Sequence, residues 1–197
     1  MNEPARRYAT YEDVLAAPPH MIAEVIGGEL RLQPRPAKPH AAAATALGAD
    51  LIHPFSRGRG GPGGWIILDE PELHLRADIL VPDLAGWRRT RMPTIVADEP
   101  FFTLAPDWIA EVLSPSTGKY DRTDKLAIYC RERVPWVWLV DPLQRTLEVL
   151  RLEAEQETWT LRGSWRDDAH IRAEPFDAIE LELGALWADV VLPNDRR

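Results

Sequence analysis

Two acidic residues interrupt apolar segments of the sequence, where a carboxylate needs a partner. The first is Glu111, which lies inside the segment 108–113, whose other residues are all apolar. A buried carboxylate without a partner is costly in free energy, or its pKa shifts until it is neutral. Glu111 therefore predicts a nearby cation, a metal ion or an exposed strand end. An ion pair with an arginine explains it equally well.

The second acidic residue is Asp83, which follows Pro82 in the apolar segment 79–87. An aspartate after a proline is, by itself, typical of a turn. On neighbouring strands, however, Asp83 and Glu111 can together hold a divalent cation such as Mg²⁺, with water and a substrate phosphate completing its shell. Such a cation activates water for attack on phosphorus, so the pair predicts phosphodiester hydrolysis.

A lysine close to these acids would complete such a site, and Lys125 is the main candidate. A helix that begins near Asp121 carries Lys125 at the margin of its buried face, from where the side chain can extend to the strand ends. Its ammonium group could then position the nucleophile or stabilise the transition state. The alternative is a surface ion pair with Asp121, which contributes only a few tenths of a kcal/mol. Lys119 is a weaker candidate for the same role.

The elements that must position these residues follow from hydropathy patterns and from glycine and proline positions. The expected helices are 10–17, 40–55 and 121–133; the expected strands are 24–32 as a hairpin around Gly27 and Gly28, 65–68, 79–87, 108–113, 136–140, and 146–153 with 158–165 as a second hairpin. The segments 56–64 and 88–106 are expected to be loops. This order predicts an α/β fold with a mixed sheet flanked by helices, an N-terminal cap and a C-terminal hairpin.

The composition is typical of one globular domain over residues 1–197, with a core at about 20–152 and an acidic C-terminal extension at about 153–197. No apolar run approaches the roughly 18–20 residues of a membrane span. The first ten residues lack the apolar core of a secretion signal. The single cysteine, Cys130, excludes an internal disulfide and a cysteine-based zinc site. We therefore expect a cytoplasmic protein without a membrane partner.

The net charge of −8 argues at first against a nucleic-acid partner, because phosphate binding relies on lysine and arginine. Most of this charge lies in residues 141–197, which contain 7 basic and 13 acidic side chains. By contrast, the segments 31–59 and 88–91 are locally positive. A catalytic group of carboxylates also adds negative charge that a metal neutralises. Charge alone therefore does not exclude an enzyme that acts on nucleic acid.

Several segments resemble the Uma-type family, a bacterial group assigned as restriction endonucleases within the PD-(D/E)XK nuclease superfamily. The matching residues are Glu24-Val-Ile-Gly-Gly-Glu-Leu30, the proline-rich turn before His40, Val81-Pro82-Asp83, Glu111-Val-Leu-Ser-Pro-Ser-Thr117, Tyr120-Asp121-Arg122, Lys125-Leu126, Val134 and Trp138-Leu-Val-Asp-Pro142. The resemblance runs from about residue 10 to 152 and is most specific from Glu111 to Pro142.

The resemblance implies a restriction-endonuclease-like core of helix, three strands, helix and strand. It places Asp83 on the second core strand and Glu111 on the third, where this superfamily keeps its metal-binding acids. In the E-x-K form of the motif a lysine stands two residues after the glutamate, but this chain has Leu113 there. The family supplies the lysine from the following helix, which favours Lys125.

Two further residues match family positions. Glu24 could add a carboxylate near the metal, or could cap a backbone group or pair with an arginine. His40, at the start of a helix, could contact phosphate or metal, or could have a structural role at the helix end. Both interpretations stay open for each residue.

These observations predict a Mg²⁺-dependent endonuclease acting on DNA, with Mn²⁺ as a substitute metal and RNA as a less favoured substrate. A homodimer fits because this superfamily often cuts two strands with two active sites. One alternative is a non-catalytic binding or assembly module with the nuclease fold, which the weak basicity and the lack of a separate DNA-binding motif favour. Another is a toxin-like or mobile-element nuclease that a partner protein directs.

Overall fold

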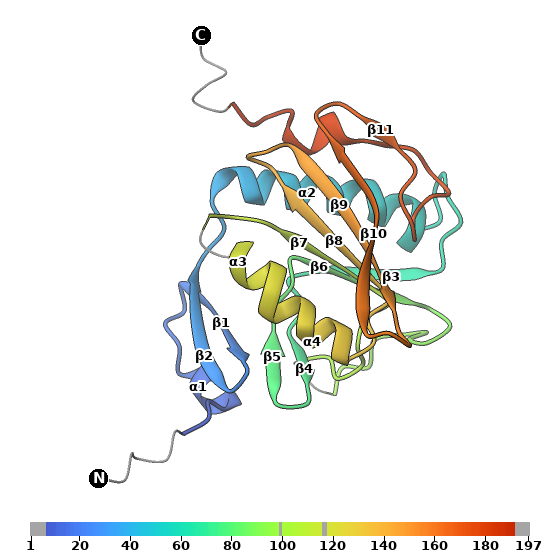
Figure 1. The fold of residues 1–197 in the computed structure, drawn as a ribbon. Coiled ribbons are helices and arrows are strands. Elements are labelled where there is room, and N and C mark those ends of the chain that lie inside the picture. Colours follow the sequence, from blue (N-terminus) through green and yellow to red (C-terminus); the bar gives the residue numbers. More distant parts are fainter. Residues whose placement is uncertain (1–6, 99, 116–117, 192–197) are drawn as a thin grey trace.

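The largest sheet of the protein has six strands, in the order β10-β9-β8-β7-β6-β3, and helices lie on both of its faces (Figure 1). This arrangement comes from a computed structural model that describes residues 7–98, 100–115 and 118–191. Ser116 and Thr117, which belong to the family-like segment after Glu111, lie outside the described residues. The fold is mixed α/β, as expected from the sequence.

A short helix and a hairpin form the N-terminal part. Helix α1 (Tyr11–Leu15) begins after Thr10, whose backbone N–H donates to the Asp13 carboxylate at 2.8 Å. Strands β1 (Met21–Ile26) and β2 (Glu29–Pro34) pair antiparallel around Gly27 and Gly28, which both have positive φ. Glycine adopts this conformation without strain, so the two residues set the tight turn that the sequence predicts.

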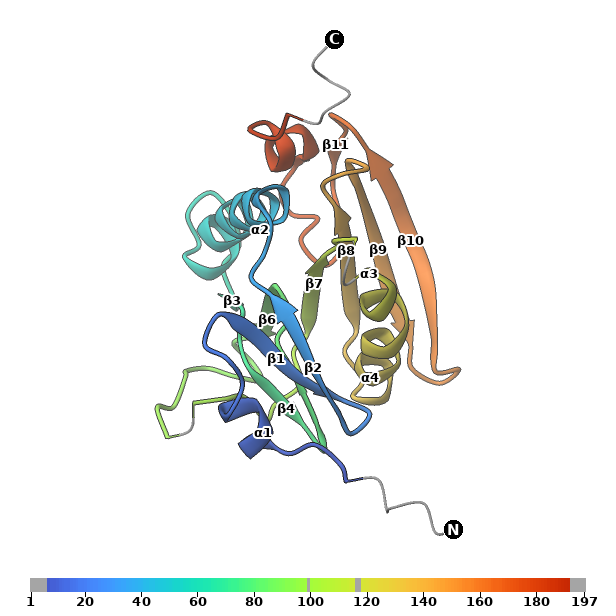
Figure 2. The same ribbon diagram turned by 90° about the vertical axis from the view of Figure 1, so that its left-hand side faces the viewer.

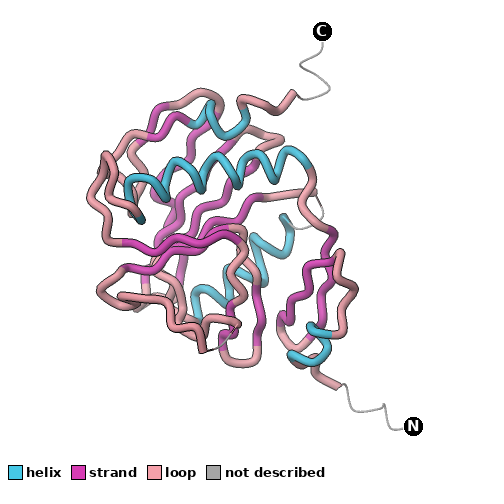
Figure 3. Tube along the Cα trace, turned by 180° about the vertical axis from the view of Figure 1, so that it is seen from behind, coloured by secondary structure: helices cyan, strands magenta, loops and turns pink. Residues whose placement is uncertain are grey.

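Helix α2 (Lys38–Leu51) lies across one face of the large sheet, as Figure 3 shows from behind. It begins two residues before the expected start and continues into a π-helical turn, Ile52–Ser56. Pro54 inside this turn has no N–H to donate, so a regular α-helical ladder cannot continue through it. The expected loop follows and leads into the first strand of the large sheet.

The segment 79–87 forms two strands in two different sheets, so the single strand that we expected is wrong. These two strands are β5 (Asp78–Leu80) and β6 (Leu84–Arg88). Their neighbours in the sheets include β3 (Trp65–Asp69), β4 (Leu73–Leu75) and β7 (Trp108–Val112). Strand β5 joins β1 and β4 in a four-stranded sheet, whereas β6 joins β3 and β7. Pro82 lies at the crossing and cannot donate to a strand ladder. Asp83 therefore precedes its strand instead of lying near the end of one.

The parallel strands β7 and β8 (Trp136–Asp141) are connected by a helical segment that packs on the face opposite α2 (Figure 2). Its parts are α3 (Gly118–Tyr120), the π-helical turn η2 (Asp121–Lys125) and α4 (Leu126–Arg131). The segment starts three residues before the expected helix. The π turn buries both Asp121 and Lys125, which directs two charged side chains toward the sheet.

The C-terminal part extends the sheet and covers helix α2. Strands β9 (Thr146–Glu153) and β10 (Thr158–Arg166) form the expected hairpin next to β8. Then β11 (His170–Ile171), β12 (Leu181–Glu182) and the 3₁₀ turn Leu183–Trp187 follow, and Phe176 and Trp187 join the core around α2. None of the described helices is both long and apolar enough to cross a membrane.

Two hydrophobic clusters fill the two faces of the sheet. Trp108, Ala110 and Val112 of β7 belong to the cluster under α2, whereas Ile109 and Leu113 belong to the cluster under α4. Because side chains alternate along a strand, the residue at position 111 points to the α4 face. The core packing thus directs Glu111 toward the helix that carries the lysine.

Candidate active site

Glu111 lies on the buried strand β7 and is 2% exposed. Its Oε1 atom accepts a hydrogen bond from the Tyr129 hydroxyl at 2.5 Å, and its Oε2 atom accepts one from Lys125 Nζ at 3.3 Å. The carboxylate therefore has the partners that its burial requires. Both partners come from the helical segment that connects β7 to β8.

Lys125 is 3% exposed and forms ion pairs with three carboxylates. Its Nζ atom lies 3.1 Å from Glu24 Oε1, 3.3 Å from Glu111 Oε2 and 3.4 Å from Asp121 Oδ1. The predicted pair with Asp121 is present, but it is buried instead of lying on the surface. Lys125 is thus the central cation of a buried charge cluster.

Glu24 reaches this cluster from strand β1 of the smaller sheet and is fully buried. Its Oε2 atom accepts a hydrogen bond from Gln33 Nε2 at 2.5 Å, and its Oε1 atom accepts one from the Val81 backbone N–H at 2.8 Å. The second bond holds the chain just before Pro82 and Asp83, where it crosses between the sheets. Glu24 therefore joins the N-terminal hairpin, the helix and the start of β6.

Asp83 and His40 form the other half of the site, with side-chain exposures of 14% and 12%. The His40 Nε2 atom lies 2.5 Å from Asp83 Oδ1, and the Val112 backbone N–H donates to Asp83 Oδ2 at 2.6 Å. The latter bond ties Asp83 to strand β7, one residue after Glu111. His40 stands in the first turn of α2, so this helix begins at the site.

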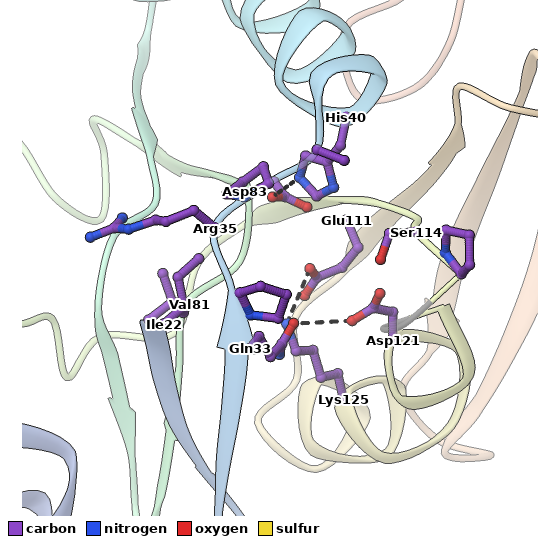
Figure 4. Close-up of a pocket in the computed structure, with 14 residues that line it drawn as sticks. Ile22, Gln33, Arg35, His40, Val81, Asp83, Glu111, Ser114, Asp121 and Lys125 are labelled. Carbon is purple, nitrogen blue, oxygen red and sulfur yellow. Dashed lines mark hydrogen bonds and ion pairs between the residues drawn. The ribbon is translucent and has the colours of Figure 1, made fainter. Parts of the chain in front are cut away.

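These residues open into one pocket of about 220 Å³. It is lined by His40, Asp83, Glu111, Ser114, Asp121 and Lys125, together with residues of β1, β2 and the proline-rich connector. Figure 4 shows the His40–Asp83 pair on one side of Glu111, with Lys125 and Asp121 on the other. The acids and the lysine thus share one cavity that a small group such as a phosphate can enter.

Burial and the neighbouring charges both shift the pKa values of the cluster. Burial raises the pKa of Glu111 well above its ordinary value, Lys125 opposes this shift, and Asp121, Asp83 and Glu24 add to it. Burial alone would lower the pKa of Lys125, but the surrounding carboxylates outweigh this and raise it well above its ordinary value. Lys125 therefore stays protonated, and a proton or an added cation is favoured at the Glu111 carboxylate.

The donor set fits a hard divalent cation. Asp83 and Glu111 offer carboxylate oxygens to the same pocket, and each oxygen keeps lone-pair capacity beyond the bond that it accepts. Mg²⁺ prefers oxygen ligands and keeps several waters in its shell. Among the residues that the structure describes, no three histidine, cysteine or acidic side chains form a complete metal site. Water and substrate would therefore supply the remaining ligands.

The structure brings five of the six predicted site residues together and leaves one outside. Asp83, Glu111, Lys125 and His40 line the pocket, and Glu24 contacts Lys125 behind it. Lys119 is exposed and lines a separate hollow with Asp141, Leu143 and Gln144. Its backbone carbonyl accepts a hydrogen bond from Thr123 in the helix. The structure therefore places Lys125, and not Lys119, in the pocket with Asp83 and Glu111.

Sequence reasoning missed Tyr129, Asp121 and Gln33 as members of the site. Asp121 and Tyr129 stand four residues before and four residues after Lys125, so they share its helix face. This spacing was a usable signal for both. Gln33 pairs with Ile22 in the backbone register of the hairpin, and its side chain reaches Glu24, two positions after Ile22, so only the folded hairpin reveals the contact.

Comparison with known proteins gives a family and a fold. The chain matches the model of the Uma2 family, described as "Putative restriction endonuclease", over residues 8–184. A solved structure described as "a putative nuclease belonging to DUF820 from Anabaena variabilis" is similar with a TM-score of 0.70 and 23% sequence identity. The match covers 91% of this chain and 98% of that one, and at this identity it shows the shared fold. No curated protein matches the chain.

Proposed function

The chain belongs to the Uma2 family, and from this premise and the geometry of the site we propose that it is a Mg²⁺-dependent endonuclease that hydrolyses phosphodiester bonds of DNA. One observation carries the proposal. Lys125 reaches from a helix to within 3.3 Å of Glu111, and both line the same pocket as Asp83. Two carboxylates and a lysine in one pocket form a donor set suited to phosphodiester hydrolysis.

Asp83 and Glu111 are the residues that would hold the metal. Bound Mg²⁺ would supply an acidic, coordinated water and offset the negative charge of the substrate phosphate, and Mn²⁺ can replace it. The Asp83 carboxylate accepts a hydrogen bond from the backbone N–H of Val112, the residue after Glu111 on β7, and this bond fixes Asp83 beside the strand that carries Glu111. The His40 ring holds Asp83 from the other side.

Lys125 is the residue proposed to act on the reacting groups. Its ammonium group stays protonated among the carboxylates, so it can donate hydrogen bonds to the attacking water or to a phosphate oxygen. A fixed positive charge in a water-poor site stabilises the negative charge that develops in the transition state. Tyr129 positions the Glu111 carboxylate through its hydroxyl.

A non-catalytic binding module with the same fold is the second candidate. It is favoured by the finding that every carboxylate of the site already accepts bonds from the protein, and by the absence of a complete three-residue metal group from the described part of the chain. A nuclease directed by a partner protein fits the same geometry. Cleavage of RNA and homodimerisation stay predictions.

A cleavage assay tests the proposal. Purified protein is incubated with supercoiled plasmid, single-stranded DNA and RNA in Mn²⁺, in Mg²⁺ and in EDTA. We expect nicked or linear plasmid in the metal samples alone, with activity lost in Glu111→Gln. Glu155→Gln, an exposed glutamate in the β9–β10 turn, is the matched control and should cleave as wild type does. Activity that persists in Glu111→Gln or in EDTA would contradict the proposed site.

A further inference from the structure

Four exposed arginines lie on two segments that the fold brings together. Arg57 and Arg59 lie on the glycine-rich loop before β3, and Arg88 and Arg89 lie at the end of β6. The Arg89 backbone N–H donates to the carbonyl of Gly64, the last residue of the loop, at 2.9 Å. The two positive segments of the sequence are thus adjacent in space.

The nearby carboxylate of Asp107 pairs with Arg91 and accepts a hydrogen bond from the Arg88 backbone N–H, so its ion pair is not with any of these four arginines. In the described part of the chain, none of the four arginines forms an ion pair with a carboxylate. The segments 53–64 and 88–91, on which they lie, contain no acidic residue. Arg88 lies over the Trp65 ring at 4.5 Å, and Arg89 donates to the Pro93 carbonyl. Exposed arginines without acidic partners are the side chains that bind phosphate groups. In a chain with net charge −8 this concentration of positive charge is unusual.

These arginines lie at the opposite end of β6 from the catalytic pocket. Asp83 precedes the strand and Arg88 ends it, so Arg88 stands five positions after Asp83. At about 3.3 Å per residue, this is a distance of about 17 Å. Figure 1 shows α2 running from the end of β2 toward the loop before β3.

A groove follows α2 from the site toward the arginines. Its volume is about 370 Å³, and the residues that line it include His40, Gly48, Ile52, Asp69, Glu70 and Asp83. It therefore starts at the His40–Asp83 pair, where it shares both residues with the catalytic pocket. At its other end, the Ile52 carbonyl accepts a hydrogen bond from the Arg57 backbone N–H at 3.1 Å.

We propose that Arg57, Arg59, Arg88 and Arg89 form a second phosphate-binding surface, which holds the backbone of duplex DNA about 17 Å from the bond that is cleaved. This inference rests on the proposed function in taking DNA as the substrate. Phosphates of one strand repeat every ~3.4 Å along the duplex axis, so the surface lies about five base pairs from the cleaved bond. The substrate is therefore a polynucleotide that extends past the pocket, and short oligonucleotides do not reach the arginines.

Fluorescence anisotropy in EDTA measures this binding without cleavage. The probe is a labelled DNA duplex of about 30 base pairs, titrated at several salt concentrations. We expect Arg57→Ala/Arg59→Ala and Arg88→Ala/Arg89→Ala each to weaken binding by about tenfold at low salt. The plot of log K against log salt concentration has a negative slope, and its magnitude should decrease by about 2 in each variant.

Arg151→Ala/Arg172→Ala is the matched control. Arg151 lies over the Trp136 ring, as Arg88 lies over a tryptophan, and Arg172 donates to a backbone carbonyl, as Arg89 does. Both control residues are exposed, and this variant should bind as wild type does. Arg57→Ala/Arg59→Ala changes only exposed loop side chains, so it tests the surface even if Arg88→Ala disturbs the packing on Trp65.

The outcomes separate this inference from the proposed function. Three results would overturn the proposed phosphate-binding surface, whatever the cleavage assay shows. These are wild-type affinity in both arginine variants, an equal loss of affinity in the control variant, and no DNA binding by the wild-type protein. Arginine-dependent binding by a protein that cleaves nothing would support the surface and contradict the nuclease.

Discussion

The Nζ atom of Lys125 lies 3.3 Å from the Oε2 atom of Glu111, although the residues are 14 positions apart, one on a helix and one on a strand. The same ammonium group contacts Glu24 and Asp121 within 3.4 Å. One cation thus joins the hairpin, the central strand and the crossover helix. Stability and the proposed chemistry both depend on it.

Replacement of Lys125 should therefore affect both properties. Lys125→Met keeps the length of the side chain but leaves buried carboxylates without their cation, which costs about 3–5 kcal/mol when one partner of a buried pair is removed. Urea unfolding in EDTA measures the loss, and the cleavage assay should show no activity. Lys119→Met, on the exposed start of the same helix, is the control and should leave both unchanged. A loss below about 1 kcal/mol for Lys125→Met would mean that the cluster is not formed as described.

The hydroxyl of Tyr129 should contribute through Glu111. Tyr129→Phe removes the donor 2.5 Å from Glu111 Oε1 and keeps the ring, so we expect a loss of about 1–3 kcal/mol in the free energy of unfolding. Cleavage should fall because the carboxylate is less well oriented. In the control Tyr120→Phe, the ring on which Arg31 lies is kept and no site contact is lost. Equal stability of the two variants would contradict the role given to Tyr129.

Asp78 should hold the N-terminal hairpin in place for Glu24. Its carboxylate is buried and accepts bonds from the Gly27 backbone N–H at 2.7 Å and from Arg131 at 2.8 Å. Asp78→Ala should lower the free energy of unfolding by about 1–3 kcal/mol and increase hydrogen exchange in β1 and β2. The exposed Asp189→Ala serves as the control. Exchange that rises equally in all strands would point to global destabilisation instead.

The thiol of Cys130 should react slowly at neutral pH. Burial raises its pKa, and the nearby Glu157 raises it further. The thiolate is the reactive form, so the rate of alkylation by iodoacetamide should rise only as the pH passes through this raised pKa. The rise should occur at a higher pH than for a free cysteine. Mass spectrometry follows the single cysteine without ambiguity. Glu157→Gln should shift the profile to lower pH, and an unshifted profile in both proteins would contradict this environment.

The sequence was sufficient to predict most of the charged residues that share the pocket, because its acids stand where acids are costly. Glu111 interrupts an apolar strand, and the structure supplies the partners that this predicts. The lysine was harder to place, since Leu113 occupies the usual position and packs in the core under α4. Only the family resemblance and the spacing on the helix pointed to Lys125.

The missed features depend on contacts that no local pattern encodes. The strand expected at 79–87 is divided because the chain changes sheets at Val81 and Pro82, and Glu24, 57 residues before Val81, binds the backbone there. Strand β4 has only three residues, too few for a pattern of its own. Hydropathy reports burial, but it does not report which sheet a buried residue joins.

Titration calorimetry with Mn²⁺ is the measurement that tests the central claim most directly. Wild-type protein and Asp83→Ala are titrated under the same conditions, with Asp189→Ala as a control for the loss of one carboxylate. We predict saturable binding to wild type and to the control, and no binding to Asp83→Ala. Absence of binding to wild type, or equal binding to all three proteins, would contradict a metal site built on Asp83 and Glu111.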